Sequence, residues 1–299
     1  MRVLLTGGTG FIGSSIAKRL LSEGNEIALI VRPSSKLTLL EDIKDKVTLI
    51  VDQGDIYSLA DAMKEFKGDV LIHLASLFIA EHKTDDVDNI LESNIRFPTH
   101  LLEAMKLAGI KKIINTASSW QNYNNEEFNP VCLYASTKEA FEDIIRFYVE
   151  AEGFSCITLT IYDSFGFGDN RRKIINLFKR IADSGESLDM SGGEQKINLV
   201  YIDDIVSAYS IALNMIKDFE KENKKYFLRT NEFLSLREIA ATYSKVNNVK
   251  LNINWGLRPY RKREVMVPYE NGEILPGWNP QYTLEKGLIK MREAELNNK

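Results

Sequence analysis

The sequence predicts a doubly wound α/β fold, in which a parallel sheet carries helices on both faces and a smaller C-terminal lobe follows. Three observations support this prediction. Segments with the patterns of strands and helices alternate through the first two-thirds of the 299 residues. A glycine-rich turn joins the first strand to the first helix. The alternation ends near Phe165, and four prolines between 259 and 280 indicate loops rather than another strand–helix–strand unit.

The individual elements are predicted from apolar runs and from helix start and stop signals. Strands are expected at 3–5, 26–31, 47–51, 70–74, 112–116 and 156–161, and helices at 12–22, 58–66, 88–108 and 134–152. After Phe165 we expect a helix at 169–184, a strand at 197–201, a helix capped by Asp203 or Asp204, a capping box from Ser235 to Glu238, and a terminal helix from about Leu284. Residues 1–165 should form a Rossmann-type dinucleotide-binding domain to which about 196–230 returns, with 166–299 mainly forming the second lobe.

The turn after the first strand carries Gly7, Gly10 and Gly13 and enters the helix through Phe11 and Ile12. Glycines let the backbone approach a pyrophosphate, and the N–H groups and dipole of a helix N-terminus favour its negative charge. Because the turn lies on the first strand of a βαβ unit, it indicates a dinucleotide site. The alternative is a glycine turn that only packs the helix against the sheet.

Composition excludes several classes of function. The chain has 44% hydrophobic and 27% charged residues and a net charge of -4, so it offers no basic stripe for nucleic acid. No apolar run of about 18 residues and no signal-peptide pattern occurs, so we expect a cytoplasmic protein without a membrane segment. Cys132, Cys156 and three scattered histidines predict neither a disulfide nor a metal site.

The loop after the second strand carries Arg32, Ser34, Ser35 and Lys36, with no acidic residue before Glu41. An acid at this place would bind the ribose hydroxyls of NAD, whereas cations and hydroxyls suit the 2′-phosphate of NADP. We therefore expect a preference for NADP(H), with NAD(H) as the alternative cofactor. A solvated basic loop is the other interpretation.

Two further strand ends supply candidate cofactor contacts. Asp55 and Ile56 follow the third strand, where the carboxylate would accept a hydrogen bond from the adenine amine or cap the next helix. His73 is interpreted as a packed strand residue. The small side chains that follow it leave room for the ribose and nicotinamide, and the candidate residues there are Leu74, Ala75 and Ser76.

The candidate catalytic residues are Ser119, Tyr134 and Lys138. A tyrosine and a lysine four residues apart lie on one face of a helix, so we expect the ammonium to lower the pKa of the phenol and to reach a ribose hydroxyl. A phenol with a lowered pKa serves as general acid or base at a carbonyl or alcohol. Ser119, at the end of the fifth strand, would add a hydrogen bond to the same oxygen.

With these motifs the chain resembles the extended short-chain dehydrogenases/reductases of the NAD-dependent epimerase/dehydratase family. The motifs are TGGTGFIG from Thr6, GDI from Gly54, HLAS from His73, YASTK from Tyr134 and YIDD from Tyr201, with Asn94 before a long helix. The resemblance implies an oxidoreductase that binds a nucleotide-diphosphate sugar in its C-terminal lobe, Asn94 at the cofactor site, and a catalytic hydroxyl four residues before Tyr123, at Ser119. It also implies a homodimer formed by the helices around 90–107 and 134–150, and the alternative is that these helices only cover the sheet.

Departures from the family's pattern refine the implied reaction. The dehydratases have an Asp-Glu pair after the catalytic hydroxyl, where this chain has Trp120 and Gln121, so 4,6-dehydration is not expected. Asp163 replaces the asparagine that is usual near the end of the sixth strand. The segments SSWQNY, YASTKEAFE, MSGGEQ and REVMVPY resemble reductases of nucleotide-linked 4-keto-6-deoxyhexoses, such as CDP-abequose, CDP-paratose and dTDP-fucose synthases.

Cations in the second half of the chain are candidates for binding the substrate's diphosphate, because arginine pairs phosphate oxygens bidentately. The densest cluster lies at 258–263 and contains Arg261 and Arg263, and further candidates are Arg171, Arg172 and Lys196. A solvated charged surface is the alternative. The other expected substrate contacts are Ser119, Trp120, Gln121 and Asp163.

The sequence therefore predicts an NADPH-dependent 4-reductase of a nucleotide-diphosphate 4-keto-6-deoxyhexose. The first alternative is a 4-epimerase with tightly bound NAD, which needs the same three catalytic residues. The second is a dinucleotide-sensing binding protein without catalysis, because a fold alone does not establish function.

Overall fold

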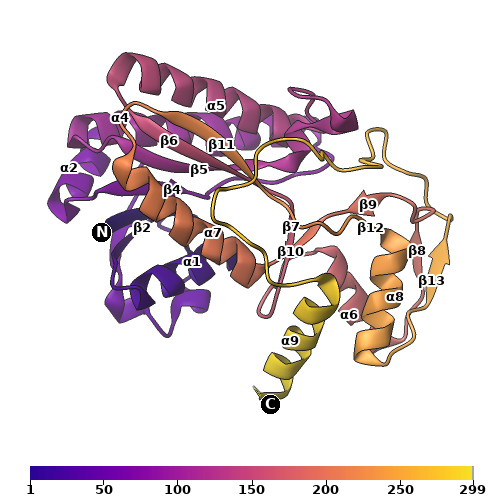
Figure 1. Cartoon of the computed structure of the whole chain (residues 1–299). Helices are drawn as coiled ribbons and strands as arrows, with labels where there is room; N and C mark the ends of the chain where they lie inside the picture. Colours follow the sequence, from indigo (N-terminus) through magenta and orange to yellow (C-terminus); the bar gives the residue numbers. More distant parts are fainter. Residues whose placement is uncertain (298–299) are drawn as a thin grey trace.

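The computed structural model describes residues 1–297 and centres on a seven-stranded sheet (Figure 1). Its strand order is β11-β6-β5-β4-β1-β2-β3, and all neighbouring strands are parallel. The chain winds from β1 outward to β3 and then from β4 to the opposite edge. The reversal between β1 and β4 creates the crevice at the strands' carboxyl ends where such sheets bind ligands. The predicted doubly wound, Rossmann-type fold is confirmed.

The six predicted strands are present close to the predicted positions. They are β1 Arg2–Thr6, β2 Glu26–Val31, β3 Thr48–Val51, β4 Val70–His73, β5 Lys112–Ser118 and β6 Ser155–Ile161. The sequence predicts no strand at β11 Asn223–Leu228, which extends the sheet beyond β6. The first half of β11 is polar and largely exposed, so its apolar run is too short to indicate a strand.

The helices of the sheet region follow the predictions with one interruption. The predicted starts agree within two residues for α1 Phe11–Ser22, α2 Ile56–Phe66 and α5 Leu133–Glu152. The helix predicted at 88–108 is divided into α3 Val87–Leu91, a π-helical turn at Glu92–Arg96 and α4 Phe97–Ala108. Such turns inside helices occur frequently at functional sites, and Asn94 lies in this one.

Both faces of the sheet are buried. Successive strand residues point to opposite faces, so Leu4 packs in a core with α2, α4 and α5, whereas Val3 and Leu5 pack in a core with α1 and α7 Ile202–Met215. Figure 1 shows these two helical layers above and below the sheet. Parallel sheets require this arrangement because neither face can remain in water.

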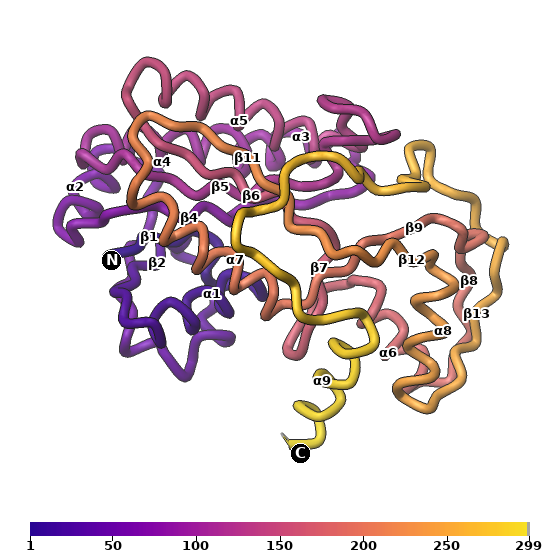
Figure 2. The backbone as a smooth tube through the Cα atoms, viewed as in Figure 1, coloured from indigo at the N-terminus to yellow at the C-terminus, as the bar shows by residue number. Residues whose placement is uncertain are grey.

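Apart from α7 and β11, the residues after β6 build a smaller group of elements, at the right and lower centre of Figure 1. Its helices are α6 Ile174–Ser184, α8 Leu236–Asn247 and α9 Leu284–Asn297. Three pairs of short strands complete it: β7 Asp163–Phe165 with β10 Leu199–Tyr201, β8 Leu188–Met190 with β13 Ile253–Trp255, and β9 Lys196–Ile197 with β12 Leu234–Ser235. Figure 2 shows the chain returning from β13 past β11 before α9, where Phe227 N donates to Glu273 O at 2.8 Å.

Two predictions in this region need correction. The helix expected from 169 begins at Ile174. The strand expected at 197–201 is interrupted at Asn198, whose buried amide nitrogen donates to Thr230 O at 2.9 Å and Glu232 O at 2.8 Å. A buried amide with backbone partners on another segment fixes the chain at a bend rather than in a continuous strand.

The predicted caps of the later helices had different outcomes. Neither Asp203 nor Asp204 caps α7, because its N-cap is Tyr201 and no side chain caps it. The Asp204 carboxylate instead accepts from the backbone N of Gln281 at 2.8 Å and of Tyr282 at 3.1 Å. The capping box from Ser235 to Glu238 and the start of α9 at Leu284 are confirmed.

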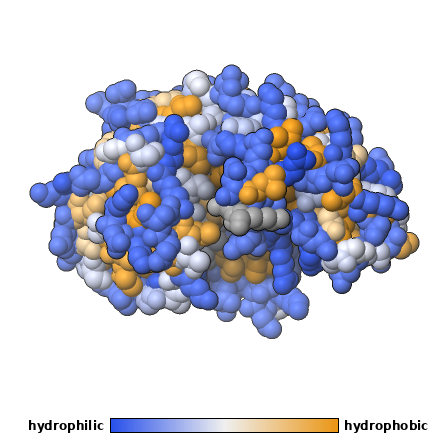
Figure 3. All heavy atoms as spheres, turned by 90° about the horizontal axis from the view of Figure 1, so that it is seen from below, coloured by the Kyte–Doolittle hydropathy of each residue, from blue (hydrophilic) through white to orange (hydrophobic). Residues whose placement is uncertain are grey.

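None of the helices between residues 1 and 297 combines the length and apolar character that a membrane span requires. The same described residues contain no group of three or more His, Cys, Asp or Glu side chains placed to hold a metal ion. Cys132 and Cys156 are both free. The face shown in Figure 3 is mostly hydrophilic, with hydrophobic residues in small separate groups.

Candidate active site

The glycine turn lies between β1 and α1, at the crevice of the sheet. Gly7 has a φ of +71°, and a Cβ there would lie 2.8 Å from Ala75 N. A Cβ on Gly13 would lie 2.2 Å from Gly7 O, so both positions need glycine for packing. The turn also suits a pyrophosphate, because no side chain caps α1 at Gly10 and the first N–H groups of the helix are not used by a cap.

The segment after β4 packs against this turn. His73 is buried, and its Nδ1 lies 2.8 Å from Thr6 Oγ1, which also accepts a hydrogen bond from Ala75 N at 3.2 Å. Burial, and to a smaller degree the charge of Lys138, holds the pKa of His73 well below its usual range. The imidazole is therefore neutral, and His73 is the packed strand residue that the sequence predicts.

Tyr134 and Lys138 lie one turn apart on the buried face of α5, with exposed fractions of 8% and 3%. Burial lowers the pKa of Lys138 to about 8, and the charge of Glu142 opposes this effect. Glu142 itself forms an ion pair with Lys225 at 2.9 Å. Lys138 is therefore a desolvated ammonium at the centre of the site.

The pKa of Tyr134 is raised to about 12, against the predicted direction. Burial is the largest cause, and hydrogen bonds with the hydroxyls of Ser118 and Ser76 offset it only in part. The prediction of a lowered pKa is wrong here, because the cost of burying a phenolate exceeds any stabilisation by the ammonium of Lys138. Tyr134 is protonated at neutral pH and has a proton to donate.

The serine that bonds to the Tyr134 phenol is Ser118 rather than the predicted Ser119. Ser118 ends β5, and Ser119 begins a short 3-10 turn, so the chain changes direction between them. The Ser118 hydroxyl also accepts a hydrogen bond from Trp120 N at 3.3 Å. Counting residues cannot show which of two adjacent hydroxyls faces the phenol when a turn begins between them.

Asn94 uses its amide within the protein. Its oxygen accepts from Leu77 N at 2.8 Å, and its nitrogen donates to Leu77 O at 3.0 Å and to Thr137 Oγ1 at 3.1 Å. It therefore ties the segment after β4, which supplies Ser76, to α5, which supplies Tyr134. These bonds give Asn94 a positioning role, and its predicted contact with the cofactor stays a prediction.

The loop after β2 presents exposed cations. Arg32, Ser34 and Lys36 are exposed, and Ser35 closes the loop by accepting from Arg32 N at 3.1 Å and donating its own N–H to Arg32 O at 2.9 Å. The first acids that follow are taken by other lysines, because Lys44 pairs with Glu41 and Lys18 with Asp42. The loop therefore keeps its positive charge at the end of a strand bordering the crevice.

At the end of β3, Asp55 caps α2. Its Oδ2 accepts from Ser58 N at 2.7 Å, and Ile56 is the first residue of the helix. Of the two roles that the sequence allows for Asp55, capping is confirmed.

An aromatic ring adjoins Tyr134 and a second ring adjoins the first, and only the second, Trp120, is a predicted site residue. Phe78 contacts Tyr134 edge-on, with ring centroids 5.0 Å apart, and its ring centroid lies 5.3 Å from that of Trp120. Phe78 is not among the residues predicted from the sequence. The available signal is an aromatic residue two positions after Ser76, beyond a strand end where small residues prevail.

Gln121 does not face the site. It is buried, its Nε2 donates to Glu139 at 2.6 Å and Glu142 at 2.7 Å, and its Oε1 accepts from Ser118 N at 2.9 Å. Both ends of its amide already bind protein groups, so this geometry gives no support to the predicted substrate contact. Gln121 instead fixes the end of β5 against α5.

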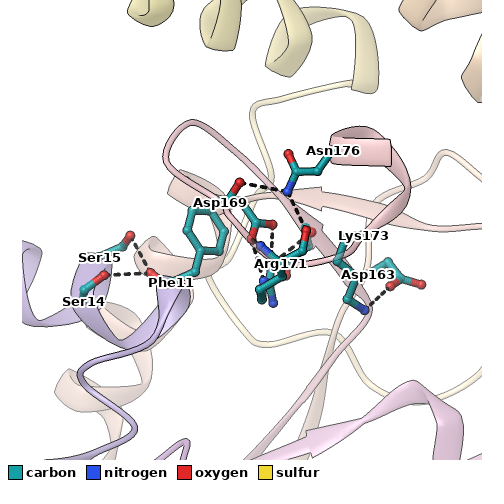
Figure 4. A network of polar contacts seen from close by, with 9 residues as sticks. Phe11, Ser14, Ser15, Asp163, Asp169, Arg171, Lys173 and Asn176 are labelled. Carbon is teal, nitrogen blue, oxygen red and sulfur yellow. Dashed lines mark hydrogen bonds and ion pairs between the residues drawn. The ribbon is translucent and has the colours of Figure 1, made fainter. Parts of the chain in front are cut away.

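Figure 4 shows that Arg171, a predicted phosphate ligand, is hydrogen-bonded to protein groups. Its Nε and one terminal nitrogen each donate to Asp169 at 2.7 Å, and the same terminal nitrogen donates to Ser164 Oγ at 2.9 Å. The guanidinium also lies 4.8 Å from the ring centre of Phe11 in the glycine turn. Arg171 therefore holds its loop against the glycine turn, and its contact with phosphate stays a prediction.

The other charged candidates differ in how far they are paired. Asp163 pairs with Lys173 at 2.8 Å, and Arg261 donates to Glu264 at 2.9 and 2.6 Å. Arg263 donates to Asn129 and stacks on Tyr123 at 4.1 Å, and its buried Nε has no acceptor among the described residues. Arg172 and Lys196 are exposed, as a solvated charged surface would be.

Known proteins that resemble this chain identify its family. The model of the NAD dependent epimerase/dehydratase family matches residues 3–226. The chain belongs to this family. The resemblance stated from the glycine turn and the YASTK motif is thereby confirmed.

Curated relatives align over nearly the full length. The CDP-abequose synthase of Salmonella muenchen is 26% identical over 294 residues, which cover 97% of this chain and 96% of the relative. A UDP-glucose 4-epimerase of Mycolicibacterium smegmatis is 27% identical over 317 residues, covering 99% of each. The solved structure of UDP-glucose 4-epimerase from Thermotoga maritima has a TM-score of 0.85 at 21% identity and covers 100% of this chain and 99% of that one, which shows the shared fold.

Proposed function

We propose that this protein uses NADPH to reduce the C4 keto group of a nucleotide-diphosphate 4-keto-6-deoxyhexose. The observation that carries the proposal is the protonated, buried Tyr134, which bonds to the hydroxyls of Ser76 and Ser118 one turn from Lys138. A phenol in this setting donates a proton to an oxygen on which negative charge develops. The full-length similarity to CDP-abequose synthases supports a deoxysugar nucleotide as substrate.

Each residue has a defined part in this reaction. Bound NADPH supplies the hydride that adds to C4. Tyr134 donates its proton to the C4 oxygen, so that the carbonyl becomes an alcohol. Ser118 donates a hydrogen bond to the same oxygen, and the charge of Lys138 stabilises the phenolate left on Tyr134 until solvent reprotonates it. The glycine turn and the segment after β4 fit the cofactor because they bring unused helix N–H groups and closely packed backbone to one place.

The composition of the site favours reduction over dehydration. Losing water from C6 requires an acid and a base near C5 and C6. The two residues after Ser119 are Trp120 and Gln121, neither of which ionises, and Gln121 is turned away from the site. A 4-epimerase remains the second candidate, because UDP-glucose 4-epimerases are also full-length relatives and epimerisation needs no such acid.

Cofactor stoichiometry tests the proposal. The purified protein is incubated with NADPH and 4-keto-6-deoxyhexoses linked to CDP, dTDP, GDP or UDP. We expect one NADPH to be consumed for each keto-sugar reduced on the accepted nucleotide. An epimerase would instead interconvert hexoses without net nicotinamide oxidation and would purify with NAD bound. No reaction of either kind would support a binding protein without catalysis.

The basic loop underlies the proposed preference for NADPH. Arg32→Ala is expected to lower kcat/KM for NADPH by about 10- to 100-fold, because a hydrogen bond to a charged group contributes about 1.5–3 kcal/mol, and to leave kcat/KM for NADH nearly unchanged. The measurement is the NADPH/NADH ratio of kcat/KM, with Lys64→Ala on α2 as the control. An unchanged ratio in Arg32→Ala would assign the loop to the solvated surface.

The two serines at the end of β5 can be separated by mutation. We expect Ser118→Ala to lower kcat by about 100-fold, the usual effect of losing a donor to a developing oxyanion, and Ser119→Ala to lower it much less. Steady-state rates with NADPH and the accepted keto-sugar give both values under the same conditions. The reverse order would restore Ser119 to the catalytic role.

We further propose a cytoplasmic homodimer formed through α4 and α5, as the family resemblance implies. Leu107 on α4 and Phe147 on α5 are exposed, and two such helices from each copy would pack as a four-helix bundle. In each copy, the dinucleotide would be bound by residues 1–165 together with about 196–230. The sugar nucleotide would be bound mainly by residues 166–299, of which 298–299 lie outside the described residues. Sedimentation equilibrium is expected to give twice the mass of the chain.

A further inference from the structure

The Tyr134 phenol has two chemically different kinds of neighbour. The hydroxyls of Ser76 and Ser118 bond to it, and the ring of Phe78 packs against it edge-on at a centroid distance of 5.0 Å and an interplanar angle of 82°. Phe78 is 44% exposed, which is unusual for an aromatic side chain in contact with a buried tyrosine. Part of the Phe78 ring is therefore free to contact a ligand.

Trp120 extends this apolar surface. Its ring centroid lies 5.3 Å from that of Phe78, at 65°, an edge-to-face geometry that fixes both rings. Cations border the pair: Lys173 Nζ lies 5.1 Å from the centre of the Phe78 ring, and Arg261 lies 4.9 Å from that of Trp120. Each cation already has a carboxylate partner, because Lys173 pairs with Asp163 and Arg261 with Glu264. Phe78 and Trp120 thus form an aromatic wall, and each neighbouring cation is paired with a carboxylate.

We propose that Phe78 and Trp120 form a subsite for the C6 methyl group of a 6-deoxyhexose. This inference rests on the proposed function, in which Tyr134 protonates the C4 oxygen. C6 is attached to C5, the ring carbon next to C4, so it must lie beside the groups that surround the phenol. The two serine hydroxyls suit the C4 oxygen, which leaves the Phe78 ring and the adjoining Trp120 for the carbon substituent.

The wall selects by chemistry as well as by shape. A methyl group gains by leaving water for an aromatic surface, whereas a 6-hydroxyl at the same place would lose its hydrogen bonds to water. An apolar pocket rejects an added hydroxyl only moderately, by up to about 100-fold. We expect a preference of about tenfold for a 6-deoxyhexose over the matching hexose, carried mainly by Phe78.

The test measures binding in a Tyr134→Phe background, where turnover does not interfere. Calorimetry with NADP⁺ present gives the Kd of a nucleotide-linked 6-deoxyhexose and of the same sugar with a 6-hydroxyl, using CDP-, dTDP-, GDP- and UDP-linked pairs. We expect the 6-deoxy sugar to bind about tenfold more tightly, Phe78→Asn to abolish the preference, and Phe78→Leu, which stays apolar, to keep most of it. Leu49→Asn removes an exposed apolar side chain from the edge strand β3, outside the proposed sugar site and the proposed dimer helices, and should leave the ratio unchanged.

The outcomes separate this inference from the proposed function. Equal binding of the two sugars, or a preference that survives Phe78→Asn, would overturn the methyl subsite. The proposed function would still hold if the wild type reduced a keto-sugar with NADPH. The expected ratios in a protein that never oxidises NADPH would support the subsite and reject the reductase. Failure of every nucleotide sugar to bind, with NADP⁺ binding intact, would reject both.

Discussion

Tyr134→Phe is expected to lower kcat by about 10²- to 10⁴-fold, the usual contribution of a positioned general acid. The substitution removes a single oxygen from a side chain that is 8% exposed, so the packing against Phe78 and the course of α5 should persist. The pKa of Tyr134 is raised to about 12, so the wild-type group carries its proton throughout the neutral range, and phenylalanine has none to give. NADPH binding should change little because the glycine turn and the loop after β2 are separate segments.

The matched control is Tyr148→Phe on the same helix. Tyr148 is also buried, but its hydroxyl bonds to Glu103 on α4 rather than to the site serines. The same loss of an oxygen should therefore leave kcat within about threefold, because a hydrogen bond to a carboxylate contributes about 1.5–3 kcal/mol to stability and this one takes no part in the reaction. Rates from NADPH consumption and cofactor affinity from fluorescence titration give both quantities. Full activity in Tyr134→Phe would remove the proposed mechanism.

The fold could be predicted because its signals are local and repeated. The strands from β1 to β6 are apolar runs separated by helices of the right length, and Gly7, Gly10 and Gly13 identify the first crossover. β11 could not be predicted from the sequence because half of its residues are polar. Its place at the edge of the sheet depends on pairing with β6 more than on its own apolar pattern. Tertiary partners similarly interrupt the strand at Asn198.

The residue types of the candidate site could be predicted from the sequence, but the hydrogen-bond partners of those residues could not. Tyr134 and Lys138 are found by helical spacing, which the backbone fixes. The serine, by contrast, depends on a turn that starts between two identical residues. The partner of Gln121 is Glu139, which only the folded chain brings into contact with it. Charge in a sequence indicates what a side chain is able to bind, and the neighbours decide what it does bind.

Lys138→Met is expected to stabilise the cofactor-free protein at pH 7 while abolishing turnover. Burial lowers the pKa of Lys138 from the ordinary 10.5 to about 8. At about 1.4 kcal/mol per pKa unit, keeping this ammonium charged in the folded state costs about 3 kcal/mol. Methionine has a similar length and no charge, so the free energy of unfolding at pH 7 should rise by up to about 3 kcal/mol.

The pH dependence distinguishes this cause from a change in packing. Between pH 8 and the ordinary pKa the unfolded chain binds more protons than the folded one, so the wild type gains stability as the pH rises through this window. Lys138→Met should lack this gain, and its advantage over the wild type should shrink above pH 8, as urea unfolding at several pH values would show. The control Lys64→Met replaces an exposed lysine on α2 and should follow the wild-type curve.

Activity should respond to the same proton in the opposite sense. Turnover by the wild type requires the charged Lys138, so kcat should fall as the pH rises through about 8, in the range where the free energy of unfolding increases. A buried charge that lowers the free energy of unfolding is expected where the charge acts in the reaction, as we propose for Lys138. If Lys138→Met proved less stable than the wild type at pH 7, or kcat were flat across pH 8, the buried ammonium would be a packing residue and its proposed role in the reaction would be withdrawn.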